Sequence, residues 1–375
     1  MRSIPILDLK AQLSAYRERA LTAMIEVMDS QHFILGPKVK EFEDNLGQWL
    51  NLSSAVGVSS GTDALLVALM AIDIQPGDEV IVPALSFFAT AGVVARLGAT
   101  PVFVDIDPQT FNMTEDRVQA AITSKTKAII PVHLFGQAAD LGHFYETPRA
   151  ERPYIIEDAA QSLGAQLRGK YTGHLGDLCC TSFFPSKNLG GFGDGGAVYG
   201  VDEAALERVR VLRVHGSKPK YHHHFVGGNF RLDEIQAAIL QIKLDFLDSW
   251  ARARRENAAR YHTAFEERNL IEAERLTPPF QLEQATHVYN QFVIRTPHRD
   301  DLNTWLTEHG IGTMIYYPSP LHTQPCFQNF GYSEGDFPHA ERACKEVLAL
   351  PVYPELTAED HDYIVDVIEA FFNQK

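Results

Sequence analysis

One lysine stands in a setting that suits covalent chemistry. The stretch SFFPSKNLGGFGDGGAV, residues 182–198, holds Lys187 just after the apolar run CCTSFFP and just before a series of glycines. A lysine at the edge of a buried strand loses solvation, and this lowers the pKa of its amine. Because Schiff-base chemistry requires a neutral amine, we interpret Lys187 as a candidate nucleophile. The glycines would let the backbone pass close to a flat cofactor.

Two other interpretations of the glycines fail on sequence order. Gly191, Gly193 and Gly196 match G-x-G-x-x-G, the pattern of dinucleotide-binding loops. That motif follows a strand and opens a helix, whereas here PSKNLG precedes the glycines and the strand-like AVYG follows them. A P-loop carries its lysine after the glycines, and Lys187 comes before them. The order therefore disfavours both a nucleotide-dependent oxidoreductase and a triphosphate-binding loop.

Further polar groups could serve a pyridoxal phosphate cofactor. Asp158 ends the strand-like PYIIEDA, and parallel strands place ligands at their carboxyl ends. A carboxylate there could keep a pyridine nitrogen protonated, so that the ring acts as an electron sink. Gln161 could contact the ring hydroxyl. Gly61 and Thr62, in SSGTDAL, open a predicted helix whose N–H groups would bind a phosphate.

Alternating strand and helix patterns must position these groups. The predicted helices are SSGTDALLVALMAID, with Thr62 as its cap, SFFATAGVVARLGA, and TEDRVQAAI, with Thr114 as its cap. The predicted strands are DEVIVPAL, TPVFVDID, KAIIPVHLF and PYIIEDA. This alternation predicts an α/β fold with helices on both faces of a mixed, mostly parallel sheet.

The C-terminal third has a different pattern. Residues Leu232 to Arg260 read as one long helix that crosses into a smaller domain. After it, THVYNQFVIR and IGTMIYYP read as strands, and DLNTWLTEH and GDFPHAERACKEVLAL read as helices. We therefore expect a large domain with an N-terminal arm at residues 1–250 and a small α+β domain at residues 251–375.

Composition narrows the function class. The chain has 33 Lys and Arg against 48 Asp and Glu, a formal net charge of −15, which speaks against binding nucleic acid through a broad basic face. No apolar run approaches the length of a membrane span. The four cysteines lack zinc-like spacing, and the start MRSIPILDLK lacks the apolar core of a signal peptide, so we expect a cytoplasmic protein. We expect no metal site either, because consecutive histidines such as those at 222–224 cannot all face one ion.

Four segments together resemble one family. SSGTDAL, EDAAQSLGA, SFFPSKNLGGFGDGGAV and NFRLDEIQAAIL are similar to the DegT/StrS sugar aminotransferases, which are fold-type I pyridoxal phosphate enzymes. The resemblance runs from FILGPKVKEFE near residue 33 to the YYPSPLH of residues 316–322. It implies amino transfer, by family likeness from L-glutamate, to a keto sugar carried on a nucleoside diphosphate, for amino-sugar and polysaccharide biosynthesis.

The resemblance also implies roles for individual residues. Lys187 would be the Schiff-base lysine that also moves the proton, and Asp158 would hold the ring nitrogen. The remaining implied roles are Gln161 on the ring hydroxyl, Gly61, Thr62 and Ser182 on the phosphate, Phe87 stacked on the ring, and Arg231, Tyr316 and Tyr317 on the sugar-nucleotide side. Asn229 would reach the phosphate of a neighbouring protomer, which implies a homodimer with shared active sites.

The resemblance leaves alternatives for the substrate and the activity. The stretch YHHHFVGGNFRLDEIQAAIL is similar to members that act at the 3-position of the sugar, so we favour a 3-keto over a 4-keto substrate. Members with histidine in place of the lysine resemble dehydratases, and Lys187 favours a transaminase. Some relatives are described as regulatory or sensory proteins, but a complete set of Lys187, Asp158 and Gln161 favours catalysis.

Overall fold

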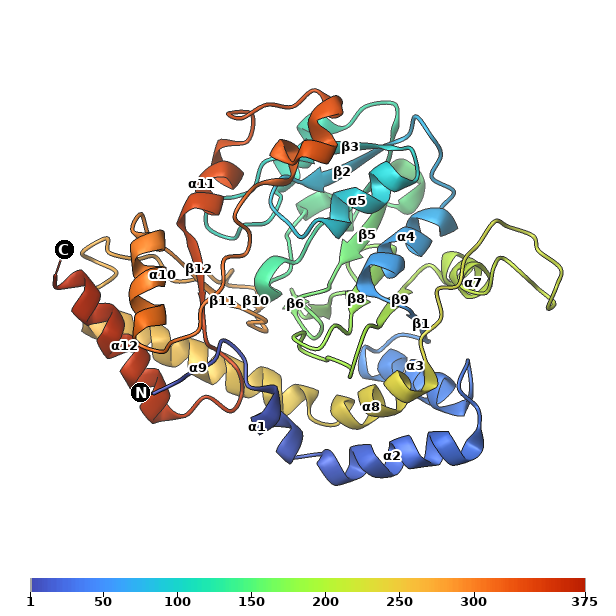
Figure 1. The fold of residues 1–375 in the computed structure, drawn as a ribbon. Helices are drawn as coiled ribbons and strands as arrows, with labels where there is room; N and C mark the ends of the chain where they lie inside the picture. Colours follow the sequence, from blue (N-terminus) through green and yellow to red (C-terminus); the bar gives the residue numbers. More distant parts are fainter. Residues whose placement is uncertain (1, 375) are drawn as a thin grey trace.

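A seven-stranded sheet forms the centre of the protein (Figure 1). The structure is a computed structural model that describes residues 2–374. Across the sheet the strands follow the order β1 (Ala55–Val58), β9 (Gly196–Gly200), β8 (Leu178–Ser182), β5 (Tyr154–Asp158), β4 (Thr126–Ile129), β2 (Glu79–Pro83) and β3 (Thr100–Val104).

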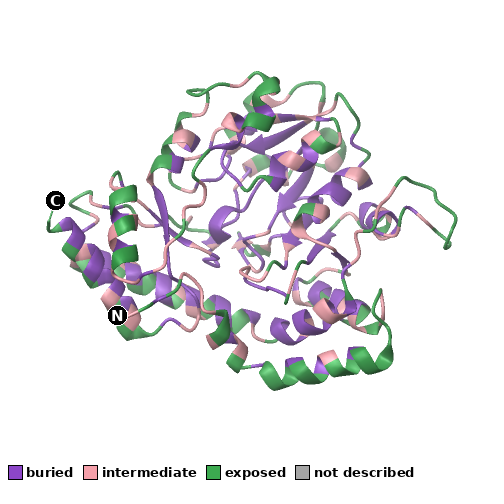
Figure 2. Ribbon diagram, viewed as in Figure 1, coloured by how far each residue is buried: buried purple, intermediate pink, exposed green. Residues whose placement is uncertain are grey.

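The sheet is mixed and mostly parallel, as predicted. Each neighbouring pair from β8 to β3 is parallel, and β9 alone runs antiparallel to both of its neighbours. The strands are short, apolar and buried on both faces, as is typical of a sheet enclosed by helices (Figure 2). The adjacent Cys179 and Cys180 show this, because they pack into separate apolar clusters on opposite faces.

Helices cover both faces of the sheet. On one face lie α4 (Gly61–Ala71), α5 (Ala89–Arg96) and α7 (Glu203–Leu212). On the other face lie α3 (Pro37–Trp49), α6 (Glu115–Ala121) and α8 (Glu234–Leu244). The short α1 (Leu9–Ser14) leads into α2 (Arg17–Ser30), which packs on the outer side of α8 (Figure 1).

The long helix predicted from Leu232 to Arg260 is wrong, because two helices occupy this stretch. Helix α8 ends at Leu244, and α9 (Leu247–Glu267) begins after Phe246. The Phe246 ring packs on Trp250 and on Tyr16, with ring centroids 5.4 Å and 6.1 Å away. The break in the helix thus places an aromatic side chain against the N-terminal segment, a contact that the local pattern does not reveal.

A second, smaller core lies at the other end of the molecule. Strands β11 (Phe292–Arg295) and β12 (Val347–Leu350) pair antiparallel, beside α9, α10 (Arg299–Glu308) and α12 (Ala358–Phe372) (Figure 1). Ile4 also packs into this core. The remaining elements are α11 (Pro338–Glu346) and the short strands β6 (Gln166–Leu167), β7 (Lys170–Tyr171) and β10 (Ala285–Thr286). The division of the chain near residue 250 stays a prediction.

Two predicted elements of the C-terminal third differ from the structure. The segment IGTMIYYP is not a strand: Met314 pairs with Ala349, and the chain then turns so that Tyr316 and Tyr317 face a cavity. The helix predicted over GDFPHAERACKEVLAL ends at Glu346, and its last residues form β12. Among residues 2–374, no helix is long and apolar enough to cross a membrane.

Candidate active site

A cavity of about 400 Å³ opens at the carboxyl ends of β2, β5 and β8. The predicted site residues that line it are Gly61, Thr62, Phe87, Asp158, Gln161, Ser182, Lys187, Tyr316 and Tyr317. They come from separate loops of the large sheet and from the segment before residue 318, so only the fold brings them together. Asn229 and Arg231 are not among its lining residues.

Lys187 lies in the loop that links β8 to the antiparallel strand β9. Its backbone N–H donates to the carbonyl oxygen of Phe184 at 2.9 Å, which closes a tight turn after β8. Burial lowers the pKa of the Lys187 amine to about 8, and the charge of Asp158 opposes this shift. A large neutral fraction near pH 8 is what a lysine nucleophile needs.

Asp158 is the last residue of β5 and faces the same cavity. Its Oδ2 accepts from the Thr90 hydroxyl at 2.8 Å, and its Oδ1 accepts from the Ala160 N–H at 3.2 Å. Burial raises the pKa of the Asp158 carboxyl, and the Thr90 hydroxyl, the Ala160 N–H and the Lys187 charge oppose the rise. The side chain is thus held in one orientation, with a lone pair still available to a ligand.

A corner suited to an anion forms where α4 begins beside the end of β8. The predicted cap Thr62 is wrong: Ser60 is the N-cap, and its hydroxyl accepts from the Asp63 N–H at 3.0 Å. The first N–H groups of a helix lack acceptors within it, so they can bind an anion. A Cβ at Gly61 would lie 2.6 Å from the Ser182 Cβ, so only glycine lets the two elements meet this closely.

The opposite wall of the cavity is polar and aromatic. The Gln161 Oε1 accepts from the Phe135 N–H at 2.6 Å, and its Nε2 donates to the Tyr317 hydroxyl at 3.2 Å. Burial, followed by the nearby Asp158 charge, raises the pKa of Tyr317, which keeps this hydroxyl protonated. Phe87 is exposed at the cavity mouth, with its ring centroid 6.2 Å from that of Tyr317.

Sequence reasoning missed several lining residues, among them Ser86, Asp194 and Gln291. Gln291 interacts with the Tyr316 hydroxyl, while its Oε1 is buried and has no partner among the described residues. Because Gln291 directly precedes β11, far in sequence from Lys187 and Asp158, no local pattern marks it. Ser86 directly precedes Phe87, so its position beside a predicted site residue was the one available signal.

Asn229 and Arg231 lie at the base of a projecting arm. The arm, residues 213–228, leaves the end of α7 and extends away from the sheet (Figure 1). Asn229 is exposed and forms an isolated bridge with Val214 where the arm returns. Within the arm, 78% of Tyr221 and 93% of Val226 are exposed. This chain alone therefore does not bring Asn229 to its own cavity.

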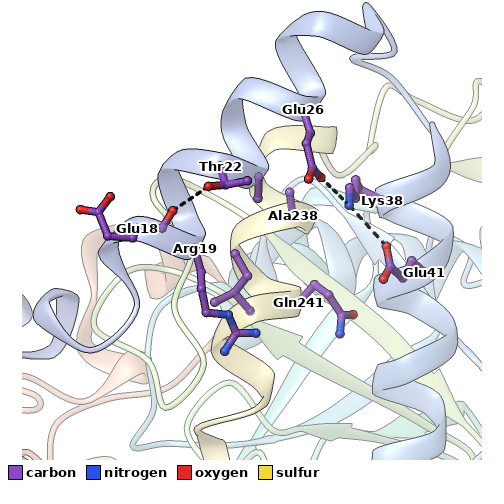
Figure 3. A pocket seen from close by; sticks show the side chains of 10 residues that line it. Glu18, Arg19, Thr22, Glu26, Lys38, Glu41, Ala238 and Gln241 are labelled. Carbon is purple, nitrogen blue, oxygen red and sulfur yellow. Dashed lines mark hydrogen bonds and ion pairs between the residues drawn. The ribbon is translucent and has the colours of Figure 1, made fainter.

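A second cavity, of about 510 Å³, lies between α2, α3 and α8 (Figure 3). Three of its charged groups pair with one another: the Lys38 Nζ lies 3.1 Å from Glu26 and 3.8 Å from Glu41 (Figure 3). It holds none of the predicted site residues. Among the described residues, no cluster of three or more His, Cys, Asp or Glu side chains could hold a metal ion.

Curated relatives match the chain along nearly its whole length. A pleiotropic regulatory protein of Geobacillus stearothermophilus is 48% identical over 99% of both chains. A UDP-N-acetyl-3-dehydro-alpha-D-glucosamine 3-aminotransferase of Acidithiobacillus ferrooxidans is 42% identical, over 98% of this chain and 97% of the relative. A dTDP-3-amino-3,4,6-trideoxy-alpha-D-glucose transaminase of Streptomyces venezuelae is 40% identical, over 97% and 95%.

Solved structures share the fold. DesV of S. venezuelae, crystallised in complex with a ketimine intermediate, superposes with a TM-score of 0.94 at 39% identity, over 99% of both chains. NtdA of Bacillus subtilis, with its bound cofactor PMP, has a TM-score of 0.91 at 33% identity, over 100% of this chain and 86% of that one. The predicted fold-type I architecture is thus confirmed.

The cavity fits the cofactor of these enzymes, pyridoxal phosphate. An amine of lowered pKa and a carboxylate face one space, and an anion corner with no room for a side chain at Gly61 borders it. The sequence pattern of the DegT/DnrJ/EryC1/StrS aminotransferases matches residues 15–369. The chain therefore belongs to the DegT/DnrJ/EryC1/StrS family of pyridoxal phosphate-dependent aminotransferases.

Proposed function

We propose that the protein transfers an amino group from L-glutamate to the 3-keto group of a sugar linked to a nucleoside diphosphate. Four relatives that are 38–42% identical are named as aminotransferases or transaminases of UDP- or dTDP-linked sugars, with the amino group at the 3-position in several of these names, and one at 39% is named as a sensory transduction protein. The single observation that carries the catalytic part is that Lys187, with its lowered pKa, shares one cavity with Asp158.

Different residues of the cavity have different roles in the proposed reaction. When bound, pyridoxal phosphate supplies an electron sink for the carbon that loses its proton. The Lys187 amine would accept the proton from the α-carbon of the donor and return it to the cofactor carbon that carries the transferred nitrogen, acting first as base and then as acid. Asp158 balances the positive charge at the ring nitrogen. Phe87 covers the ring, and its exposed position at the mouth limits access of water to the reacting atoms.

The phosphate and the substrate are held by separate walls. The N-terminus of α4 and the Ser182 hydroxyl hold the cofactor phosphate. Tyr316 and Tyr317 face the side from which a sugar enters. The partnerless Gln291 Oε1 offers an acceptor to a sugar hydroxyl or to the ammonium group of the donor.

Two further parts of the proposal rest on the family resemblance. They are L-glutamate as the donor and a homodimer in which Asn229 reaches the phosphate in the partner's cavity, while Arg231 serves the sugar-nucleotide side. A cytoplasmic location is a third part, and it rests on the cysteine content. The absence of Asn229 from the lining of this chain's own cavity is in keeping with its role in the partner's cavity.

A regulatory role is the second candidate, and the name of the relative at 48% identity favours it. Regulation alone needs neither an amine of lowered pKa nor a carboxylate beside it. The presence of Lys187, Asp158 and Gln161 in one cavity therefore supports catalysis, whatever further role the protein has.

An amination assay tests the proposal. The purified protein is incubated with L-glutamate and with UDP-, dTDP- or GDP-linked sugars that carry a 3-keto or a 4-keto group. We expect amino-sugar product from a 3-keto substrate, and a loss of at least about a hundredfold in the Lys187→Ala variant. Turnover of only the 4-keto sugars would overturn the assigned position, and turnover of none would favour the regulatory candidate.

A further inference from the structure

The Asp158 carboxylate accepts a hydrogen bond from helix α5, which follows β2 at the carboxyl edge of the sheet. The Thr90 hydroxyl, in the first turn of α5, lies 2.8 Å from the Asp158 Oδ2. The Ser86 hydroxyl lies 2.9 Å from the Thr90 hydroxyl. Both side chains are buried, with Thr90 0% and Ser86 3% exposed. Three polar groups, each buried for the most part, are thus joined by two hydrogen bonds at the wall of the cavity.

The number of protons available fixes which group donates in each of these two hydrogen bonds. An ionised carboxylate can only accept, so the single proton of the Thr90 hydroxyl must point to Asp158. The Thr90 oxygen is then free to accept, and Ser86 must donate to it. The hydrogen bonds run from Ser86 to Thr90 to Asp158, and the last of them is strongest while Asp158 is ionised.

We propose that Thr90, supported by Ser86, is a positioning residue that holds Asp158 ionised and oriented toward the cofactor's ring nitrogen. The inference rests on the proposed role of Asp158. It adds that the segment after β2 serves the cofactor twice: its loop carries Phe87 at the cavity mouth and Ser86 behind the carboxylate, and the first turn of α5 carries Thr90. Hydrogen bonds from a donor to a charged acceptor are about twice as strong as neutral ones.

Other groups also act on Asp158, and they must be separated from Thr90. Lys187 and His133 favour its charged form, and burial, followed by the Asp158 charge, raises the pKa values of Tyr317 and Cys180. The Ala160 N–H holds its other oxygen. His133 is itself held, since its Nε2 lies 2.8 Å from the buried Glu157 carboxylate. Of the groups that favour ionisation, Thr90 has the largest effect.

The test compares Thr90→Val, which keeps the shape of the side chain but removes its hydroxyl, with Thr90→Ser, which keeps the hydroxyl. The readouts are the dissociation constant of pyridoxal phosphate from pH 5 to 9 and the thermal unfolding of the cofactor-free protein. We expect Thr90→Val to weaken binding about tenfold or more. Because the pKa of Asp158 rises when the donor is lost, affinity should fall on acidification from a higher pH than in the wild type. Thr90→Ser should behave as the wild type does.

Each outcome decides the inference. An unchanged affinity and pH profile in Thr90→Val overturns it. A uniform weakening at every pH that Thr90→Ser shares also overturns it, because that pattern reports packing alone. If Thr90→Val fails to fold, Ser86→Ala is measured in the same way, and a profile like that of the wild type overturns the inference. Asp158→Asn separates the two assignments: wild-type affinity in this variant removes the proposed role of Asp158, whereas a weakened Asp158→Asn beside a normal Thr90→Val removes only that of Thr90.

Discussion

At the scale of single residues, the site depends on two groups whose pKa values burial moves in opposite directions. Burial lowers the pKa of Lys187 and raises that of Asp158, and the charge of each opposes the shift of the other. Both residues stand directly after apolar strand patterns, so the sequence could locate them. Thr90 could not be located, because it lies 68 residues from the carboxylate that it contacts.

The lowered pKa of Lys187 predicts how the cofactor-free protein reacts with pyridoxal phosphate. With a pKa of about 8, the neutral fraction of the amine rises from roughly a tenth at pH 7 to roughly nine-tenths at pH 9. The rate of cofactor attachment, followed by stopped-flow absorbance, should rise over this range and then level off. A rate that still climbs steeply between pH 9 and 10 would indicate the ordinary pKa of 10.5 and contradict the burial argument.

At the scale of elements, the cofactor corner depends on how closely α4 approaches β8. The local pattern predicted this helix, but it placed the cap at Thr62 because a hydroxyl at Ser60 and one at Thr62 look alike in sequence. The hydrogen bond from the Asp63 N–H settles the choice in favour of Ser60. The closeness of Gly61 to Ser182 depends on the packing of two elements, which no local pattern encodes.

This contact predicts a double-mutant result. The Gly61→Ala variant puts a methyl group 2.6 Å from the Ser182 Cβ, so α4 must shift and cofactor affinity should fall about tenfold. Ser182→Gly removes the obstructing side chain together with its hydroxyl. If steric conflict is the cause, the double variant should bind pyridoxal phosphate no more weakly than Ser182→Gly alone. Additive losses in an equilibrium titration would contradict this explanation.

At the scale of the whole molecule, the alternating patterns predicted the central sheet well. Each strand is short, apolar and bounded by turns, so its pattern is local. The small core was harder to predict, because the N-terminal Ile4 joins it and because β12 follows α11 without an intervening turn. The projecting arm gives no sequence signal of its direction (Figure 1), and only the fold shows that Asn229, at the base of the arm, does not line the cavity of its own chain.

The position of Asn229 predicts complementation between inactive variants. In a homodimer with shared sites, a chain with Lys187→Ala still offers Asn229 to its partner, and a chain with Asn229→Ala still offers Lys187. Refolding the two together should restore roughly a quarter of the wild-type sites, since half of the dimers are mixed and each holds one intact site. Activity equal to the average of the two separate variants would mean that each chain completes its own site.

The most direct test asks which lysine carries the cofactor. Lys243 is the matched control within the chain, because burial also lowers its pKa to about 8, but it lies outside the cavity, near the rings of Tyr16 and Trp250. The holoenzyme is reduced with borohydride, digested and analysed by mass spectrometry. We predict that the phosphopyridoxyl group is found on the peptide that contains Lys187. Its recovery on Lys243 or another lysine, or on none, would contradict the central claim that this cavity is the active site.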